Sequence, residues 1–304
     1  MTLSPDVKAF LASAGEEPKF PVGLGVDAER AWLAERRSAV PARRPPEPVG
    51  RTWDVLTGSE VRARVYLPAD PGPHPLMVYL HGGGWVMGDL EMHDGTCRQF
   101  CNRLQCSVVN VDYRLAPEHP FPVPLDDAWE AVQWAVAHAP ELKADPARLI
   151  VAGSSAGGNL AAAVALRARD QGGPEIALQL LIYPVLDPQC DTASYAEHGE
   201  GYLLDRDEME FYWRSYVPDP DRRRDPYAAP SASEALEGLP PAIVASAEYD
   251  PLRDEAEAYA RRLQDAGVPT VLRRFDGQIH GFLTLMATGS AVDELARLVS
   301  ERIS

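Results

Sequence analysis

The sequence predicts an α/β fold, with a mostly parallel central sheet, helices on both of its faces and a helical cap. Two observations indicate this class. Several short apolar runs do not alternate with polar residues, as is typical of strands buried on both faces. These runs alternate along the chain with longer helical patterns, as in repeated strand–helix–strand units. The 304 residues, 45% hydrophobic and 24% charged, suffice for one large domain or two small ones.

Residues 1–48 stand apart from this alternation because they are poor in strand signals. Amphipathic patterns predict helices around Val7–Ala14 and Ala28–Ala39, followed by a proline-rich linker, 41–48. We expect this segment to pack onto the rest of the molecule as part of a cap.

The sheet is expected to begin with a hairpin. Thr52–Leu56 and Val61–Leu67 alternate apolar and polar residues on either side of a Thr-Gly-Ser turn. Further strands are expected at Leu76–Leu80, Ser107–Val111, the run from Leu149, Leu178–Tyr183, Ile243–Ala247 and Thr270–Phe275. Helices are expected at Asp94–Leu104, Asp126–His138, the alanine-rich stretch after Ser155, Asp254–Asp265 and Ala291–Arg302. An antiparallel start followed by this alternation predicts a sheet wound on both sides.

A polar, proline-containing excursion at 186–230 interrupts the alternation and holds one expected helix, Asp205–Tyr216. It could pack with the N-terminal segment to form the cap. Ligands of open α/β sheets bind outside the carboxyl ends of the strands, so we expect a site at that edge.

A serine stands on the turn between the strand from Leu149 and the next helix. The pattern Gly153-x-Ser155-x-Gly157 is that of a nucleophile elbow, in which glycines are needed because a Cβ would collide with the turn. The N–H groups at a helix start favour the negative charge that develops in acyl transfer. The pattern alone is weak, so the interpretation depends on the rest of the chain.

A serine nucleophile needs a histidine base, which is held in turn by a carboxylate. His280 follows the last strand in a glycine-flanked loop, at the edge where Ser155 is expected. Asp250 follows a buried strand and precedes a proline, although it could instead only cap the next helix, with Asp254 or Asp276 as the partner. We favour Asp250. Other histidines are more easily interpreted as surface residues, namely His74, His119, His138 and His198.

A glycine run after Leu76–Leu80 offers backbone donors. In His81-Gly-Gly-Gly, the N–H groups of Gly83 and Gly84, with that of Ala156, can converge on one oxygen. Each such donor is worth about 10²- to 10³-fold in rate. A phosphate-cradling loop is disfavoured, because no lysine follows and the net charge is -16. His81 itself is interpreted as bracing the loop.

With these motifs the chain resembles a carboxylesterase of the hormone-sensitive-lipase-like family (bacterial family IV) of α/β-hydrolases, over about residues 50–304. The order serine, aspartate, histidine is the one that this architecture has. The resemblance rests on His81-Gly-Gly-Gly-Trp85, Asp112-Tyr-Arg-Leu-Ala-Pro-Glu118 with Pro120-Phe-Pro, Gly153-x-Ser-Ala-Gly-Gly158, Asp250-Pro-Leu-Arg-Asp254 and His280-Gly-Phe282. One departure is Ser154, where the family usually has aspartate, which affects local hydrogen bonding more than the triad.

The resemblance implies a cofactor-independent hydrolase of short- to medium-chain carboxylic esters. Ser155 would attack the ester carbonyl, His280 would move the proton, and Asp250 would orient His280; water would then release the acid from an acyl-enzyme. Gly83, Gly84 and Ala156 would form the oxyanion hole. Candidate walls of an apolar substrate pocket are Trp85, Leu204 and Phe211, which could equally belong to the core of the cap.

The resemblance also implies a division into N-terminal cap helices at 1–48, an α/β-hydrolase catalytic domain at 49–185 and 231–304, and a cap insertion at 186–230. An amidase or peptidase with the same triad is the alternative within enzymes. A non-catalytic receptor on this fold, as in plant hormone receptors resembling the family, is disfavoured because those typically lose the histidine found here as His280.

The expected partner is a small-molecule ester, with no metal and no cofactor. The net charge of -16 disfavours nucleic acid. The four cysteines are interpreted as buried free thiols. No membrane span and no secretory signal are expected, which favours a cytoplasmic location. A homodimer through the last strand is expected by resemblance only.

Overall fold

An eight-stranded sheet forms the centre of the computed structural model, which describes residues 2–14, 20–38, 46–58, 61–285 and 290–303. Its strands are β1 Arg51–Leu56, β2 Arg62–Leu67, β3 His74–Leu80, β4 Ser107–Asp112, β5 Ala144–Ser154, β6 Leu178–Ile182, β7 Ala242–Tyr249 and β8 Thr270–Ile279. They lie in the order β1-β2-β4-β3-β5-β6-β7-β8. The β1–β2 and β2–β4 pairs are antiparallel and the others parallel. The predicted hairpin and the mostly parallel sheet are confirmed.

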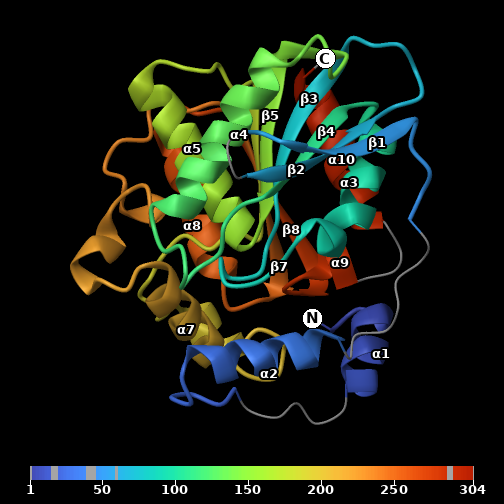
Figure 1. Cartoon of the computed structure of the whole chain (residues 1–304). Helices are drawn as coiled ribbons and strands as arrows, with labels where there is room; N and C mark the ends of the chain where they lie inside the picture. The colour runs from blue at the N-terminus through green and yellow to red at the C-terminus, as the bar shows by residue number, and fades with distance from the viewer. Residues whose placement is uncertain (1, 15–19, 39–45, 59–60, 286–289, 304) are drawn as a thin grey trace.

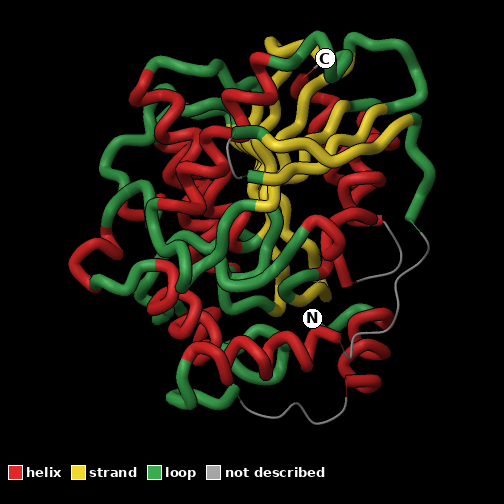
Figure 2. The backbone as a smooth tube through the Cα atoms, in the orientation of Figure 1, coloured by secondary structure: helices red, strands yellow, loops and turns green. Residues whose placement is uncertain are grey.

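Helices cover both faces of the sheet (Figure 1). On one face lie α3 Leu90–Leu104 and α10 Ser290–Ile303; on the other lie α4 Val123–Ala137, α5 Ala156–Gln171 and α8 Arg253–Asp265. Figure 2 shows the strands as a central layer between these helices. Each face has its own apolar core, and every residue of β3 is buried. Burial on both faces explains why the strand patterns are continuously apolar.

The remaining helices gather at one end of the sheet. In Figure 1, α2 Val26–Ser38 lies beside α7 Arg206–Tyr216, which belongs to the excursion, and α1 Pro5–Ala14 lies at the same end of the molecule. The rings of Phe20 and Phe211 are 5.4 Å apart and join the N-terminal segment to α7. The domain boundaries given above remain a prediction.

Two helices begin earlier than the sequence predicts. α3 starts at Leu90 instead of Asp94, because the Asp89 side chain accepts a hydrogen bond from the Met92 N–H at 2.7 Å and caps the helix. α4 starts at Val123, ahead of the two aspartates, with a proline in its first turn. Proline suits that position because the first turn has no intrahelical use for its N–H.

Short elements are missing from the prediction. α6 Ala193–His198 and α9 Phe282–Leu285 are too short to produce a helical periodicity. The predicted linker falls partly on residues 39–45, outside the described ranges. The surface interpretation of His74 is wrong, since its residue is buried and its Nε2 lies 3.0 Å from the Asp70 carbonyl oxygen. The four cysteines are free and buried, as predicted.

Within the described residues, none of the helices combines the length and the apolar composition that crossing a membrane would require.

Candidate active site

Ser155 stands alone between β5 and α5, in a strained backbone conformation. Its φ of 56° is unusual for a residue with a side chain. Backbone hydrogen bonds to the neighbouring segment hold it: the Ser155 N–H donates to the Ile182 oxygen at 2.9 Å, and the Val185 N–H donates to the Ser155 oxygen at 3.2 Å. A Cβ on Gly157 would lie 1.9 Å from the Leu80 carbonyl oxygen, so glycine is required there. The turn therefore holds Ser155 at the carboxyl end of β5, where it lines a cavity.

A continuous chain of hydrogen bonds joins Ser155, His280 and Asp250. The Ser155 Oγ lies 3.1 Å from His280 Nε2, and His280 Nδ1 lies 2.8 Å from Asp250 Oδ2. With a neutral imidazole, the serine O–H donates to Nε2 and the Nδ1–H donates to the carboxylate. The ring of Tyr183 packs edge-on against His280, with centroids 4.7 Å apart. The three residues that the sequence singles out are thus brought together in the predicted order.

Asp250 has both roles that the sequence suggests for it, as the partner of His280 and as a cap near the start of α8. Its residue is fully buried, and its second oxygen, Oδ1, accepts the Leu252 N–H at 2.9 Å. It therefore caps the turn before α8 and also contacts His280. Asp254 is engaged elsewhere, with the Ser194 N–H and the Arg253 side chain. Anchoring both oxygens fixes the direction of the carboxylate.

The glycine loop after β3 lies against the same cavity as Ser155. Gly82, Gly83 and Gly84 line that cavity. Gly83 has a φ of +123°, and a Cβ on it would lie 2.1 Å from the Met87 carbonyl oxygen, so no other residue fits without distortion. Ala156 directly follows the serine as the first residue of α5, and N–H groups at a helix start have no intrahelical partner. The glycine loop and the start of α5 therefore both adjoin Ser155.

His81 braces this loop from inside the protein. It is fully buried, its Nδ1–H donates to the Gly82 oxygen at 2.8 Å, and its ring stacks on Tyr113 with centroids 4.2 Å apart. The Tyr113 hydroxyl donates to the His81 oxygen at 2.7 Å. Burial lowers the pKa of His81 to about 4, because a charged imidazolium would lose its hydration there. His81 is therefore neutral at physiological pH.

Acid should destabilise the protein partly through His81. In the unfolded chain His81 binds a proton below about pH 6.5. In the folded protein it binds one only below about pH 4. The stability that neutral His81 contributes is therefore fully present above the unfolded-state pKa and is lost as the pH falls from that value towards the folded-state pKa. Between pH 7 and 5, the free energy of unfolding should fall by about 2 kcal/mol more in the wild type than in His81→Asn. Urea denaturation at both pH values measures this difference, and equal losses in the two proteins would contradict it.

A cavity of about 120 Å³ opens beside Ser155 and His280. Apolar cap residues line it, including Leu33 from α2, Leu203 and Leu204 before α7, and Tyr212 on α7. Of the three predicted pocket residues, Trp85, Leu204 and Phe211, only Leu204 lines this cavity. The cavity therefore lies between the serine and the cap.

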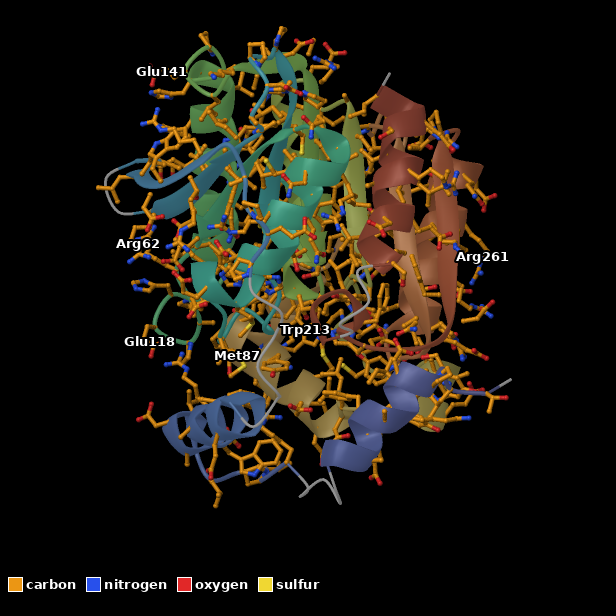
Figure 3. All side chains as sticks on the ribbon, turned by 90° about the vertical axis from the view of Figure 1, so that its right-hand side faces the viewer. Arg62, Met87, Glu118, Glu141, Trp213 and Arg261 are labelled. Carbon is orange, nitrogen blue, oxygen red and sulfur yellow. The ribbon has the colours of Figure 1, made fainter. Side chains whose placement is uncertain are left out.

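Trp85 and Phe211 do not line the cavity. The Trp85 ring stacks on Tyr216 at 4.2 Å and contacts Trp213 at 4.9 Å. Phe211 is buried against Phe20. Trp213, which is labelled in Figure 3, lies where the cap helices meet the end of the sheet. Both side chains thus belong to the core of the cap, which was the alternative interpretation.

Ser154, the departure from the family pattern, is buried and hydrogen-bonded. The Tyr79 hydroxyl donates to its Oγ at 3.1 Å and also lies 3.4 Å from His93 Nδ1. A neutral hydrogen bond therefore occupies the place beside the nucleophile where the family usually has a charge.

The chain is similar to known proteins over most of its length. A model of the alpha/beta hydrolase fold family matches residues 77–284. Carboxylic ester hydrolase LipN of Mycobacterium tuberculosis is 45% identical over 76% of this chain and 63% of its own length. The ethyl acetate hydrolase of Pseudomonas putida is 36% identical over 97% of this chain and 95% of its own. The solved ester-hydrolase EH1AB1 from the metagenome of Lake Arreo, complexed with a bipyridine phosphonate derivative, superposes with a TM-score of 0.89 at 38% identity, covering 99% of both chains.

The sequence motifs, the sheet order and the match over most of the chain agree with one another. The chain belongs to the α/β-hydrolase family, in its hormone-sensitive-lipase-like carboxylesterase branch.

Proposed function

We propose that the protein is a serine carboxylesterase that hydrolyses short- to medium-chain carboxylic esters. The observation that carries this proposal is the hydrogen-bond chain from Ser155 through His280 to Asp250. The names of the relatives support the same chemistry, since LipN and EH1AB1 are both ester hydrolases.

Ser155 is the nucleophile in this proposal. As its Oγ attacks the ester carbonyl carbon, His280 Nε2 takes the hydroxyl proton, and Asp250 stabilises the resulting imidazolium. The imidazolium then gives its proton to the leaving alcohol, which completes the acyl-enzyme. A water molecule, deprotonated by His280, attacks the acyl carbon; the imidazolium then returns that proton to the departing Ser155 Oγ, which frees the acid and restores the serine. Each proton that His280 accepts is returned within the same half-reaction.

Gly83, Gly84 and Ala156 are the proposed oxyanion hole. Their backbone N–H groups would stabilise the negative oxygen of each tetrahedral intermediate. Both glycines line the cavity beside Ser155, and Ala156 starts the helix that follows it. Preorganised donors of this kind need no rearrangement as charge develops.

The cavity size favours short acyl groups. A closed apolar cavity of about 150 Å³ holds a benzene molecule, and this one measures about 120 Å³. In a series of p-nitrophenyl esters we expect the highest kcat/KM at butyrate or hexanoate. The value should fall at least about tenfold at laurate, whose chain would have to displace Leu33 or Leu204. A maximum at laurate would contradict the assignment.

Ester specificity is tested against the amidase alternative in the same assay. We expect p-nitroanilides of the preferred acyl group to turn over at least about 10³-fold more slowly than the esters, because an anilide nitrogen must be protonated before it leaves, whereas p-nitrophenolate leaves without a proton. Comparable rates for the two substrates would favour the amidase.

A cytoplasmic location and a homodimer through the last strand remain predictions. β8 lies at one end of the strand order, with only β7 beside it among the described strands, which supports pairing with a second copy.

A further inference from the structure

Glu255 is a buried carboxyl group that the proposed mechanism does not use. It lies in the first turn of α8, five residues after Asp250, and only 4% of the residue is exposed. An acidic residue in the first turn of a helix normally faces solvent and interacts with the helix dipole. Glu255 instead points into the protein, so its burial needs another explanation.

The carboxyl group holds a backbone segment that is distant in sequence. Its Oε1 accepts the N–H of Leu186 at 2.7 Å and lies 3.4 Å from the N–H of Asp187. Its Oε2 is buried and has no hydrogen-bond partner among the described residues. Only Oε1 therefore holds the backbone at Leu186 and Asp187 by hydrogen bonds.

The segment that Glu255 holds is the one that fixes the nucleophile. Val185, directly before Leu186, donates its N–H to the Ser155 oxygen, and Ile182 accepts the Ser155 N–H. A short series of contacts therefore connects the turn bearing Asp250, through Glu255 at the start of α8, to the backbone of Ser155. His280 spans the same gap from the other side with its two ring nitrogens.

We propose that Glu255 is a positioning residue, which ties the turn bearing Asp250 to the backbone that holds Ser155 and so sets the gap that His280 bridges. This inference rests on the proposed esterase function. Glu255 does not line the cavity, so it acts through other residues and does not touch the substrate.

The contact requires an acceptor oxygen and no negative charge. Burial raises the pKa of the Glu255 carboxyl, and the nearby charges of Asp187 and Asp250 raise it further, against the opposing hydrogen bond from Leu186. The surrounding groups also include the buried side chains of Tyr195 and Cys190. A neutral carboxyl avoids a second anion beside Asp250, and a glutamine side chain offers the same carbonyl acceptor.

Two variants distinguish the effect of the hydrogen-bond acceptor of Glu255 from the effect of its side-chain volume. Glu255→Gln keeps the carbonyl oxygen, so its kcat for p-nitrophenyl butyrate should stay within about threefold of the wild type. Glu255→Met keeps the length and approximate volume but leaves the two N–H groups unpaired. Its kcat should fall about 10- to 100-fold, since a displacement of about 1 Å at a catalytic group costs up to that much. Its KM should change less than about threefold.

A matched control shows whether lost stability alone explains the result. Ser107 lies at the start of β4, at the opposite end of the sheet from Ser155, and its Oγ donates to the buried Leu142 oxygen at 2.6 Å. Ser107→Ala should lower the Tm through the loss of that bond and leave kcat unchanged. All assays are run at least about 15 °C below the lowest Tm, so that every variant is folded.

The rate of inactivation by paraoxon gives a second readout, because it reports the reactivity of the serine without acyl-chain binding. It should fall together with kcat in Glu255→Met and remain unchanged in Ser107→Ala. A Glu255→Met enzyme with wild-type kcat, or a Glu255→Gln enzyme as slow as Glu255→Met, would overturn the inference. If the wild type itself does not hydrolyse p-nitrophenyl butyrate, the proposed function fails instead.

Discussion

Ser155→Ala should lower kcat for p-nitrophenyl butyrate by about 10⁶-fold, which is the scale of the loss when a triad serine is removed. Without the Oγ no acyl-enzyme can form, and the remaining groups only polarise the ester. The backbone of the turn is held by the Ile182 and Val185 contacts, which do not involve the hydroxyl. We therefore expect an unchanged circular dichroism spectrum and a Tm within about 3 °C of the wild type.

Ser154→Ala is the matched control, because it removes the neighbouring hydroxyl and leaves the triad intact. It removes the shorter of the two contacts of the Tyr79 O–H and leaves the 3.4 Å one to His93 Nδ1, so it should cost stability of about 1 kcal/mol. Its kcat should stay within about tenfold of the wild type, since no proton passes through Ser154 in the proposed mechanism. Equal activity in Ser155→Ala and Ser154→Ala would show that Ser155 is not the nucleophile.

Asp250→Asn should lower kcat by about 10⁴-fold with little change in KM. An amide in place of the carboxylate can donate to Nδ1, which would put the imidazole proton on Nε2 and remove the base that Ser155 needs. The substitution keeps the shape of the side chain and an acceptor for the Leu252 N–H. Steady-state kinetics at several pH values measures the effect.

Asp254→Asn separates the two carboxylates that the sequence leaves as candidates. Asp254 contacts Ser194 and Arg253, whereas His280 Nδ1 contacts Asp250, so the loss of the Asp254 carboxylate should affect stability more than kcat. A large loss of kcat in Asp254→Asn together with a small one in Asp250→Asn would reverse the assignment.

The sequence predicts the catalytic residues well because each of them follows the end of a strand. Parallel strands bring their carboxyl ends to one edge of the sheet, so Ser155, Asp250 and His280 had to lie near one another once the strands were recognised. Glycine at position 83 is equally readable, since a positive φ and a close backbone contact leave a strong signal.

The pocket is much less predictable, because its walls depend on how the cap helices are rotated. Phe211 and Tyr212 are neighbours on α7, but only Tyr212 faces the cavity. Leu33 comes from α2, far away in sequence, and no local pattern marks it. Trp85 follows the glycine loop, yet its φ of 59° and its contact with Tyr216 place it in the cap core.

Glu255 illustrates a different limit. In the sequence it is an ordinary acidic residue in the first turn of a helix, which is where such residues are expected. Its burial and its contact with Leu186 arise from the packing of the excursion against α8. Such a tertiary contact between segments about 70 residues apart leaves no periodic pattern.

The most direct test of the central claim is covalent labelling of the wild-type enzyme by paraoxon, followed by peptide mass spectrometry. A nucleophilic serine displaces p-nitrophenol and keeps the diethylphosphoryl group, which mimics the tetrahedral intermediate but is released slowly. We predict one diethylphosphoryl group per chain, located on Ser155, with loss of esterase activity in proportion to labelling. Ester hydrolysis that persists after full labelling of Ser155, or inactivation with the group on another residue, would contradict the account.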